Sequence, residues 1–168
     1  ALTGMEFDDF MLLDKLNTPS DKLRDNPAKY LLYCDPFMGI FDAHITEGVN
    51  AYYKELYDKL SAIKATDDYK PYFESAAALA DVLSVKAELG IKTRAAYLAG
   101  DTKALKCIAE NDYTAAIEKL RSFHTKFRKF WFFENKPHGF DVQDIRLGGL
   151  MQRVKTCRAR LEDYCAGR

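Results

Sequence analysis

Three histidines, His44, His124 and His138, carry the side chains that most readily transfer protons or bind metal ions near neutral pH. None of them has a second histidine or a cysteine at the spacing of a metal site. His124 lies near Phe123 and Phe127 in a helical pattern, so we expect a hydrogen-bonded histidine within a helical bundle. His138 follows a Lys-Pro pair in a break between helices, and it is the histidine for which we consider a functional role.

Acid–base chemistry would require carboxylates, and two adjacent pairs occur at Asp8-Asp9 and Asp67-Asp68. Both pairs fall near expected helix ends, where the helix dipole stabilises negative charge, so we interpret them as helix caps. The sequence contains no H-E-x-x-H, no G-x-S-x-G and no phosphate-binding glycine loop. It therefore predicts no catalytic residue, no metal ion and no cofactor.

The overall charge argues against two classes of partner. Twenty-five basic and 25 acidic residues give a formal net charge of +0, which indicates neither a nucleic acid nor an anionic membrane surface. The basic residues Arg121, Lys126, Arg128 and Lys129 lie beside aromatic residues, but those aromatics occupy core positions, and we interpret the basic cluster as a solvated face. No apolar run approaches the roughly 20 residues of a membrane span, so no membrane partner is expected.

The four cysteines are Cys34, Cys107, Cys157 and Cys165, and none forms a C-x-x-C motif. Cys157 and Cys165 lie eight residues apart on an expected helix, about 12 Å along its axis, which is too far for a disulfide. We expect free, mostly buried thiols in a reducing compartment, and hence a cytoplasmic location.

Hydrophobic residues recur every three or four positions along most of the chain, and no convincing alternating strand occurs. This pattern predicts an all-α fold: an up-and-down bundle of about four long helices, a short N-terminal helix and an irregular segment over residues 17–46. The short helix is expected at 5–16 and the long helices at 46–64, 68–99, 103–133 and 142–165. Within the irregular segment, Asn26-Pro27 predicts a short helix that ends before Asp35-Pro36.

The helical pattern also predicts which residues face the core and where helices bend or begin. The residues on the predicted core-facing stripes include Phe7, Met11, Leu98, Ile145 and Tyr164. Gly90 predicts a kink or a close helix crossing, because glycine costs about 1 kcal/mol relative to alanine inside a helix. Asp101 or Thr102 is expected to cap the helix that follows Gly100.

Two adjacent glycines, Gly148 and Gly149, lie inside the last expected helix at a cost of about 2 kcal/mol. We expect that a neighbouring backbone approaches them closely, either within the bundle or from a separate domain. Asp144 and Arg146 are two residues apart, so they point in different directions, and at least one could reach outside the bundle. These four residues are our candidates for interdomain contact; the alternative for Asp144 and Arg146 is a surface pair.

Three stretches of the chain resemble one known protein domain. They are F-D-D-F-M-L-L-D at 7–14, N-P-A-K-Y-L-L-Y-C-D-P-F-M-G-I-F-D at 26–42, and K-A-E-L-G-I-K-T-R-A-A-Y at 86–97 together with E-N-K-P-H-G-F-D-V-Q-D-I-R-L-G-G-L at 134–150. In this order they resemble the C-terminal helical region of a subgroup of family 20 glycoside hydrolases, the β-N-acetylhexosaminidases.

The resemblance implies a single helical domain, 1–168, that follows a TIM-barrel catalytic domain, with 1–16 a linking helix leaving the absent barrel and 17–168 the bundle. Because the chain also begins with Ala1 rather than Met, we expect a fragment of a longer protein. The implied function is a non-catalytic accessory domain of an exo-β-N-acetylhexosaminidase, which supports the barrel and could in addition contribute to a dimer interface or to the rim of the active-site cleft. The implied partners are the barrel of the same chain, a second copy in a homodimer, and terminal N-acetylhexosamine glycans bound through the parent enzyme.

In that family the acetamido oxygen of the substrate is the nucleophile, beside an adjacent Asp-Glu pair on the barrel, unlike the usual two-carboxylate scheme. No H-x-G-x-D-E-like segment and no barrel strands occur here, so the resemblance implies no glycosidase activity for this chain alone. For the cleft rim we consider Trp131 and Phe133 as surfaces that stack on a sugar, and Asn135 or His138 as hydrogen-bonding groups. The interpretation that we prefer for the aromatic residues is closure of the bundle end.

Two further functions compete with the accessory domain. A free-standing helical module would bind a partner helix in an apolar groove. A small helical enzyme would need a buried polar cluster, which the sequence does not reveal.

Overall fold

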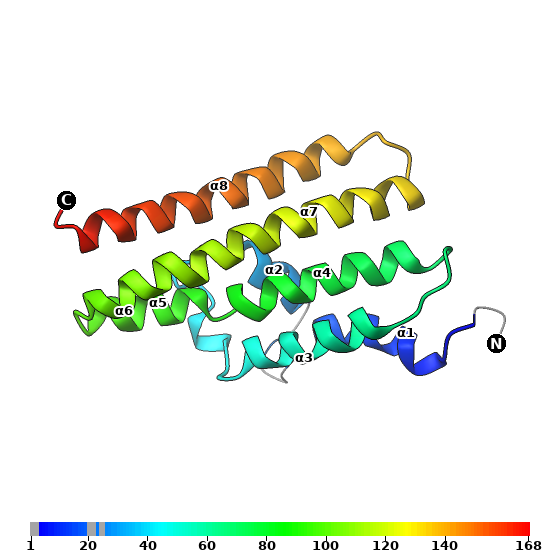
Figure 1. The fold of residues 1–168 in the computed structure, drawn as a ribbon, viewed down its shortest axis with the longest axis horizontal. Helices are drawn as coiled ribbons and strands as arrows, with labels where there is room; N and C mark the ends of the chain where they lie inside the picture. Colours follow the sequence, from blue (N-terminus) through cyan, green and yellow to red (C-terminus); the bar gives the residue numbers. More distant parts are fainter. Residues whose placement is uncertain (1–3, 20–22, 24–25) are drawn as a thin grey trace.

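The computed structural model describes residues 4–19, 23 and 26–168 of the chain and is 76% helical, with no strand among these residues. The predicted segments 1–16 and 17–46 therefore lie partly outside the described residues, at 1–3, 20–22 and 24–25. The described part is a bundle of several long helices, as the hydrophobic pattern predicts (Figure 1).

In chain order the helical elements are α1 (Phe7–Asp14), η1 (Lys15–Asn17), α2 (Pro27–Tyr33), η2 (Asp42–His44), α3 (Val49–Ala62), α4 (Lys70–Lys86), α5 (Leu89–Leu98), α6 (Thr102–Cys107), a π-helical turn (Ile108–Tyr113), α7 (Thr114–Glu134) and α8 (Phe140–Cys165). The segments α6, the π-helical turn and α7 follow one another without a break, so they replace the single helix expected at 103–133. The Asp101 carboxylate accepts a hydrogen bond from the Ala104 backbone N–H at 2.9 Å, which confirms the expected cap of α6.

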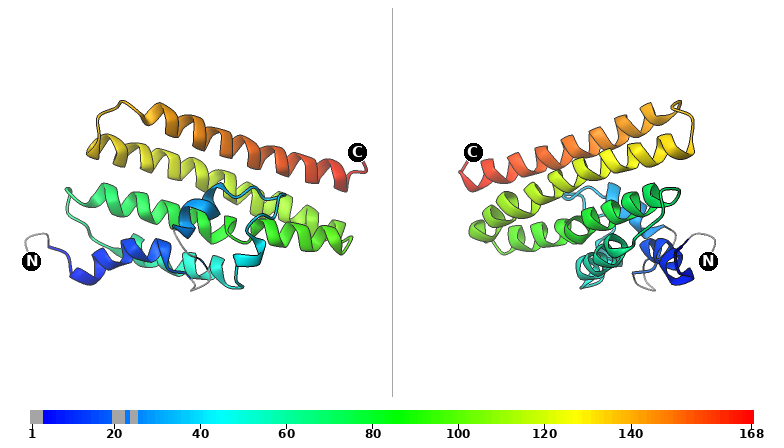
Figure 2. Two further views of the ribbon diagram at one scale, coloured as in Figure 1. Left: turned by 180° about the vertical axis from the view of Figure 1, so that it is seen from behind. Right: turned by 45° about the vertical axis from the view of Figure 1, so that its right-hand side comes forward.

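The long helices pack side by side in chain order. α4 lies between α3 and α7, and α7 lies between α4 and α8 (Figure 1). The short helix α2 and the loop after it lie against the middle of the bundle, on the face seen in the left panel of Figure 2. The fully buried side chains at the centre of this core include Tyr53, Leu83, Leu120 and Val154.

The helix expected at 68–99 is two helices, because α4 ends at Lys86 and α5 begins at Leu89. At the break, the Asn50 backbone N–H donates to the Glu88 carboxylate and the Glu88 backbone N–H donates to the Asn50 side chain, both at 3.0 Å. The second bond satisfies the Glu88 N–H at the break, and the first satisfies an N–H in the first turn of α3, which has no partner within that helix. A backbone does approach Gly90 closely, since a Cβ there would lie 2.9 Å from the Pro36 carbonyl oxygen, but Pro36 belongs to the loop after α2 and not to a crossing helix.

Several boundaries and orientations differ from expectation. α3 begins at Val49 rather than Thr46, after Gly48 in the left-handed region (φ 87°), and the cap of α4 is Tyr69 without a side-chain bond from Asp67 or Asp68. The assignment of Phe7, Leu98 and Ile145 to the core is wrong, because they are 74%, 82% and 75% exposed. Met11 and Tyr164 are exposed as well. Helical spacing defines a face, but it does not say whether another element covers that face within the domain.

Candidate functional site

Aromatic side chains close the end of the bundle where α7 turns into α8. The half-buried Trp131 ring lies 6.0 Å from Phe127 and 5.9 Å from Phe140, measured between ring centroids. Its indole Nε1 is buried and has no hydrogen-bond partner within the described part of the chain. Gly139, in the left-handed region at φ +95°, turns the chain against this ring, since a Cβ there would lie 3.6 Å from it. Trp131 therefore packs inside the domain, and its contact with a sugar stays a prediction.

The other rim candidates lie at the same end but face solvent. Phe133 is half exposed, and its ring contacts Tyr72 at 6.3 Å. Asn135 and His138 are exposed in the loop between α7 and α8, and neither side chain makes a hydrogen bond to another described residue. The structure thus brings Trp131, Asn135 and His138 to one end of the bundle, with the two polar side chains free to reach outward.

Asp144 and Arg146 point to opposite sides of α8, as expected from their spacing. The Asp144 carboxylate lies 2.6 Å from His124 Nε2, on α7, which confirms His124 as a hydrogen-bonded histidine of the bundle. The Arg146 guanidinium lies 4.7 Å from the centre of the Tyr33 ring, and burial raises the pKa of that tyrosine. Both side chains therefore have partners inside the domain, and contact with another domain stays a prediction for each.

Gly148 and Gly149 have no intramolecular neighbour that requires glycine. A Cβ built on either residue meets no atom of the described chain within 4 Å. The expectation of a close backbone approach from within the bundle is therefore wrong, because α6, the π-helical turn and α7 pack against other sides of α8. An approach from a separate domain is the interpretation that remains for the pair.

The outward side of α8 carries no charge over four turns. Its residues are Val142, Ile145, Gly149, Gln152 and Thr156, which all are exposed and which we call the outer face of α8. They follow one another at steps of three and four, so they lie along one side of the helix. A solvent-facing helix side normally carries charged residues, and this one does not.

A row of arginines on a neighbouring side of α8 holds the loop after α2. Arg146, Arg153 and Arg160 are spaced by seven residues, so they share one side of the helix. Arg153 forms an ion pair with Asp35, and hydrogen bonds from Arg153 lower the pKa of that carboxyl group. Sequence reasoning did not identify this row, although the seven-residue spacing of arginines is a visible signal.

Lys86 holds the same loop from the opposite side, and the sequence analysis also missed it. Its side chain is 3% exposed, and Nζ donates to the carbonyl oxygens of Leu31 at 3.0 Å and Cys34 at 2.7 Å. Burial lowers the pKa of Lys86 to about 8. A lysine three residues after the buried Leu83 was the available signal, because that spacing places it on the core side of α4.

The cysteines and acidic residues show no sign of a reactive centre. All four cysteines are free, but only Cys157 is buried, so the expectation of mostly buried thiols is wrong. Burial raises the pKa of the Cys157 thiol to about 11, which disfavours the nucleophilic thiolate. Within the described residues, no three His, Cys, Asp or Glu side chains gather as a metal site would need. Over the same residues, no helix has both the length and the apolar character to cross a membrane.

Comparison with the curated proteins gives no match. The family model described as the Glycoside Hydrolase 20C C-terminal domain matches residues 8–168. This match confirms the resemblance seen in the sequence and implies a glycoside hydrolase as the parent, in a chain that also carries a catalytic domain. The chain belongs to the Glycoside Hydrolase 20C C-terminal domain family, the C-terminal part of family 20 enzymes.

Proposed function

We propose that this chain is a non-catalytic accessory domain that supports the catalytic barrel of an exo-β-N-acetylhexosaminidase. The outer face of α8 is the surface that docks on the barrel. The observation that carries this proposal is an exposed, uncharged helix side that includes Gly149 and borders Gly148, two glycines without an explanation inside the domain. The domain itself would lack glycosidase activity, and the parent enzyme would act on terminal N-acetylhexosamine glycans in the cytoplasm.

The size of the outer face suits a domain contact. From Val142 to Thr156 it extends about 21 Å at 1.5 Å per residue. Ile145 is 75% exposed and Val142 is 49% exposed, and full burial of such a side chain contributes about 1.5–3 kcal/mol. Covering both would therefore stabilise a domain interface substantially, whereas leaving them in water gains nothing.

The glycine pair adds a geometric argument. Two alanines would stabilise α8 by about 2 kcal/mol in the isolated domain, since their Cβ atoms would meet nothing. Glycine at these positions lets the backbone of a partner approach α8 more closely than any side chain would allow. Asp144 and Arg146 flank this strip and are placed to make polar contacts at its edges.

The loop between α7 and α8 is the part of the domain that we assign to the rim of the active-site cleft. Asn135 and His138 are exposed there and present hydrogen-bonding groups to a sugar hydroxyl. Trp131 would fix the loop from below through its contact with Phe140. The exposed surface outside the outer face of α8 and this loop could also contact a second copy of the protein in a homodimer.

Replacing Ile145 with arginine in the full-length parent enzyme tests the docking surface. We expect the melting temperature of the parent to fall by about 2 °C or more, because about 2 kcal/mol of burial is lost and a charge enters the interface of a chain of roughly 400 residues. Hydrolysis of an aryl N-acetylglucosaminide should decline in parallel after mild heating. Leu98→Arg is the matched control, since Leu98 is 82% exposed at the far end of α5 and should shift nothing.

Equal melting temperatures for Ile145→Arg and the unmodified parent would refute docking through α8. The same result would favour the free-standing interaction module, which needs no barrel. An active chain of 168 residues would refute the accessory role itself.

A further inference from the structure

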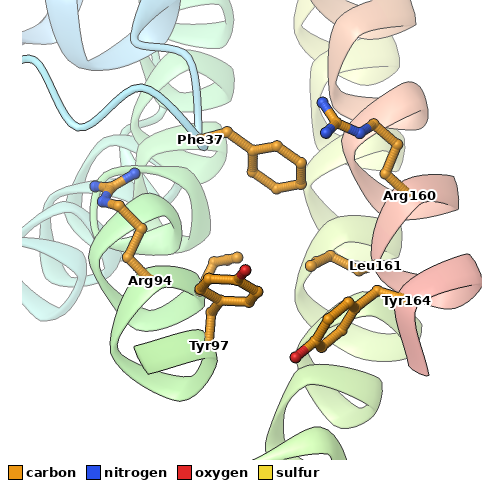
Figure 3. A pocket seen from close by; sticks show the side chains of 7 residues that line it. Phe37, Arg94, Tyr97, Arg160, Leu161 and Tyr164 are labelled. Atoms are coloured by element: carbon orange, nitrogen blue, oxygen red, sulfur yellow. The ribbon is translucent and has the colours of Figure 1, made fainter. Parts of the chain in front are cut away.

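A cavity of about 310 Å³ opens between α5, the C-terminal part of α8 and the loop after α2 (Figure 3). It lies at the opposite end of the bundle from the loop between α7 and α8 (Figure 1). Its lining residues are Phe37, Thr93, Arg94, Tyr97, Arg160, Leu161 and Tyr164. The proposed docking surface and the rim do not use this cavity.

Three aromatic rings from three different elements form the walls. Tyr97 of α5 and Tyr164 of α8 lie 5.3 Å apart between ring centroids, and their planes are inclined by 55°. Phe37 faces them from the loop, and Figure 3 shows the ring at the other end of the cavity beside Arg160. Aromatic walls with a few convergent polar groups are typical of small-ligand sites.

Among the described residues, no carboxylate pairs with the Arg160 guanidinium at this cavity. Arg94 is paired with Asp42, and Arg153, just behind Phe37, is paired with Asp35. Arg160 lies 5.3 Å from the centre of the Phe37 ring and forms no ion pair with any described residue. A guanidinium in this state favours a carboxylate, which it can hold through two parallel hydrogen bonds.

The loop is fixed well enough to keep this arrangement. Arg94 donates to the Pro36 carbonyl oxygen at 2.5 Å, and Lys86 donates to the carbonyl of Cys34 at 2.7 Å. These bonds hold the backbone on both sides of Asp35, so Phe37 stays at the cavity without a ligand. Preorganisation of this kind reduces the entropy that binding would cost.

We propose that this cavity binds a pyranose ring that carries one carboxylate, a uronic acid. Arg160 would hold the carboxylate, the rings of Tyr97 and Tyr164 would cover a face of the sugar, and their hydroxyl groups would bond its hydroxyls. The volume is at the lower end of the range for small-ligand sites, so it suits one ring rather than a longer glycan. The ring is either a free monosaccharide or the terminal residue of a glycan.

The site can be tested by adding a ligand stepwise to the 168-residue chain and monitoring the backbone amide chemical shifts by NMR. Glucuronate should shift the amides of Tyr97, Arg160 and Tyr164 and bind at least tenfold more tightly than glucose, which lacks the carboxylate, or acetate, which lacks the ring. Arg160→Gln should remove this preference, whereas the matched control Arg158→Gln should keep it, because Arg158 pairs with Glu162 outside the cavity. A disaccharide ending in glucuronate distinguishes the two possible ligands. Tighter binding of the disaccharide than of glucuronate indicates that the site binds the end of a glycan, and weaker binding indicates that it binds a free monosaccharide.

Other outcomes would overturn the proposal. Equal binding of acetate and glucuronate would show a carboxylate site without sugar recognition. Tighter binding of benzoate than of glucuronate would replace the sugar by an aromatic acid. Tyr164→Ala supplies a second variant that removes a wall without altering charge, and an unchanged glucuronate affinity in it would also refute the site. None of these results depends on the proposed docking through α8.

Discussion

Replacing Lys86 with methionine perturbs a lysine that the fold buries among backbone carbonyls. The ammonium group sits between α4 and the end of α2, where it donates to the carbonyls of Leu31 and Cys34. It has no salt-bridge partner within the described residues, and desolvation is the main reason for its lowered pKa. Methionine keeps much of the side-chain volume but removes the titratable group and both hydrogen bonds.

The contribution of Lys86 to the pH dependence of stability follows from its pKa in the folded chain and in the unfolded chain. The pKa of Lys86 is about 8 in the folded chain and takes the ordinary value of 10.5 when the chain unfolds. Below pH 8 both states hold the proton; between these values the unfolded state binds about one proton more, so stability rises with pH. At 1.36 kcal/mol per unit, the gain from pH 8 to pH 10 is about 2 kcal/mol.

Two tyrosines set the upper limit of this window. Burial holds the pKa of Tyr53 and Tyr113 above the ordinary value of 10.0. Above pH 10 the unfolded chain loses these protons while the folded chain retains them, so stability falls there. Cys157, whose pKa burial raises from 9.0 to about 11, has the same effect above pH 9 in the wild type and in Lys86→Met, so the comparison of the two chains isolates Lys86. The effect of Lys86 is therefore best measured between pH 8 and pH 10.

Urea unfolding at pH 8, 9 and 10, followed by circular dichroism, supplies the free energies. The difference in stability between the wild type and Lys86→Met should change by about 2 kcal/mol across this range, in favour of the wild type at pH 10. Lys70→Met, at an exposed position of α4, should leave the slope unchanged. A constant difference between wild type and Lys86→Met would refute the burial of an ammonium group at this position.

Substitutions at three further positions test local contacts. Trp131→Ala should lower the unfolding free energy measured in urea by about 2 kcal/mol, because it removes a half-buried ring that contacts Phe127 and Phe140. Trp131→Phe should lower it by less than about 1 kcal/mol, since the indole N–H that it removes has no partner among the described residues. Asp35→Asn should reduce the decrease in unfolding free energy that acidification causes. Because Arg153 lowers the pKa of Asp35, the Asp35 carboxylate stabilises the fold above the ordinary carboxyl pKa, and this stabilisation disappears as the pH falls through the lowered value. Gly149→Ala should raise the stability of the isolated chain by about 0.5–1 kcal/mol in the same assay, and destabilisation would contradict the open space around it.

The bundle could be predicted from the sequence because its long helices carry regular apolar seams. The seam from Leu105 to Phe123 is buried throughout, as expected. Gly90 predicts an interruption in this region, but the exact break between α4 and α5 could not be predicted, because Ala87 and Glu88 are ordinary helix formers and their partner at the break is the distant Asn50. The exposure of Ile145 could not be predicted either, since it depends on which helices happen to cover α8.

Some of the candidate sites could be predicted from the sequence and others could not. The position of Trp131, Asn135 and His138 at one end of the bundle follows from their proximity in sequence. The cavity between Phe37, Tyr97 and Tyr164 joins segments that are far apart in the chain, so no local pattern could reveal it. The same holds for Lys86, whose partners are carbonyl groups that carry no residue-type signal.

Hydroxyl-radical footprinting of the outer face of α8 tests the accessory role most directly, when the isolated chain is compared with the full-length parent enzyme. In the isolated chain, Val142, Ile145 and Leu98 should all be oxidised readily, since all three are exposed. In the parent we expect Val142 and Ile145 to be protected severalfold while Leu98 reacts as before. Equal oxidation of Ile145 in both proteins would contradict docking of the catalytic domain on α8.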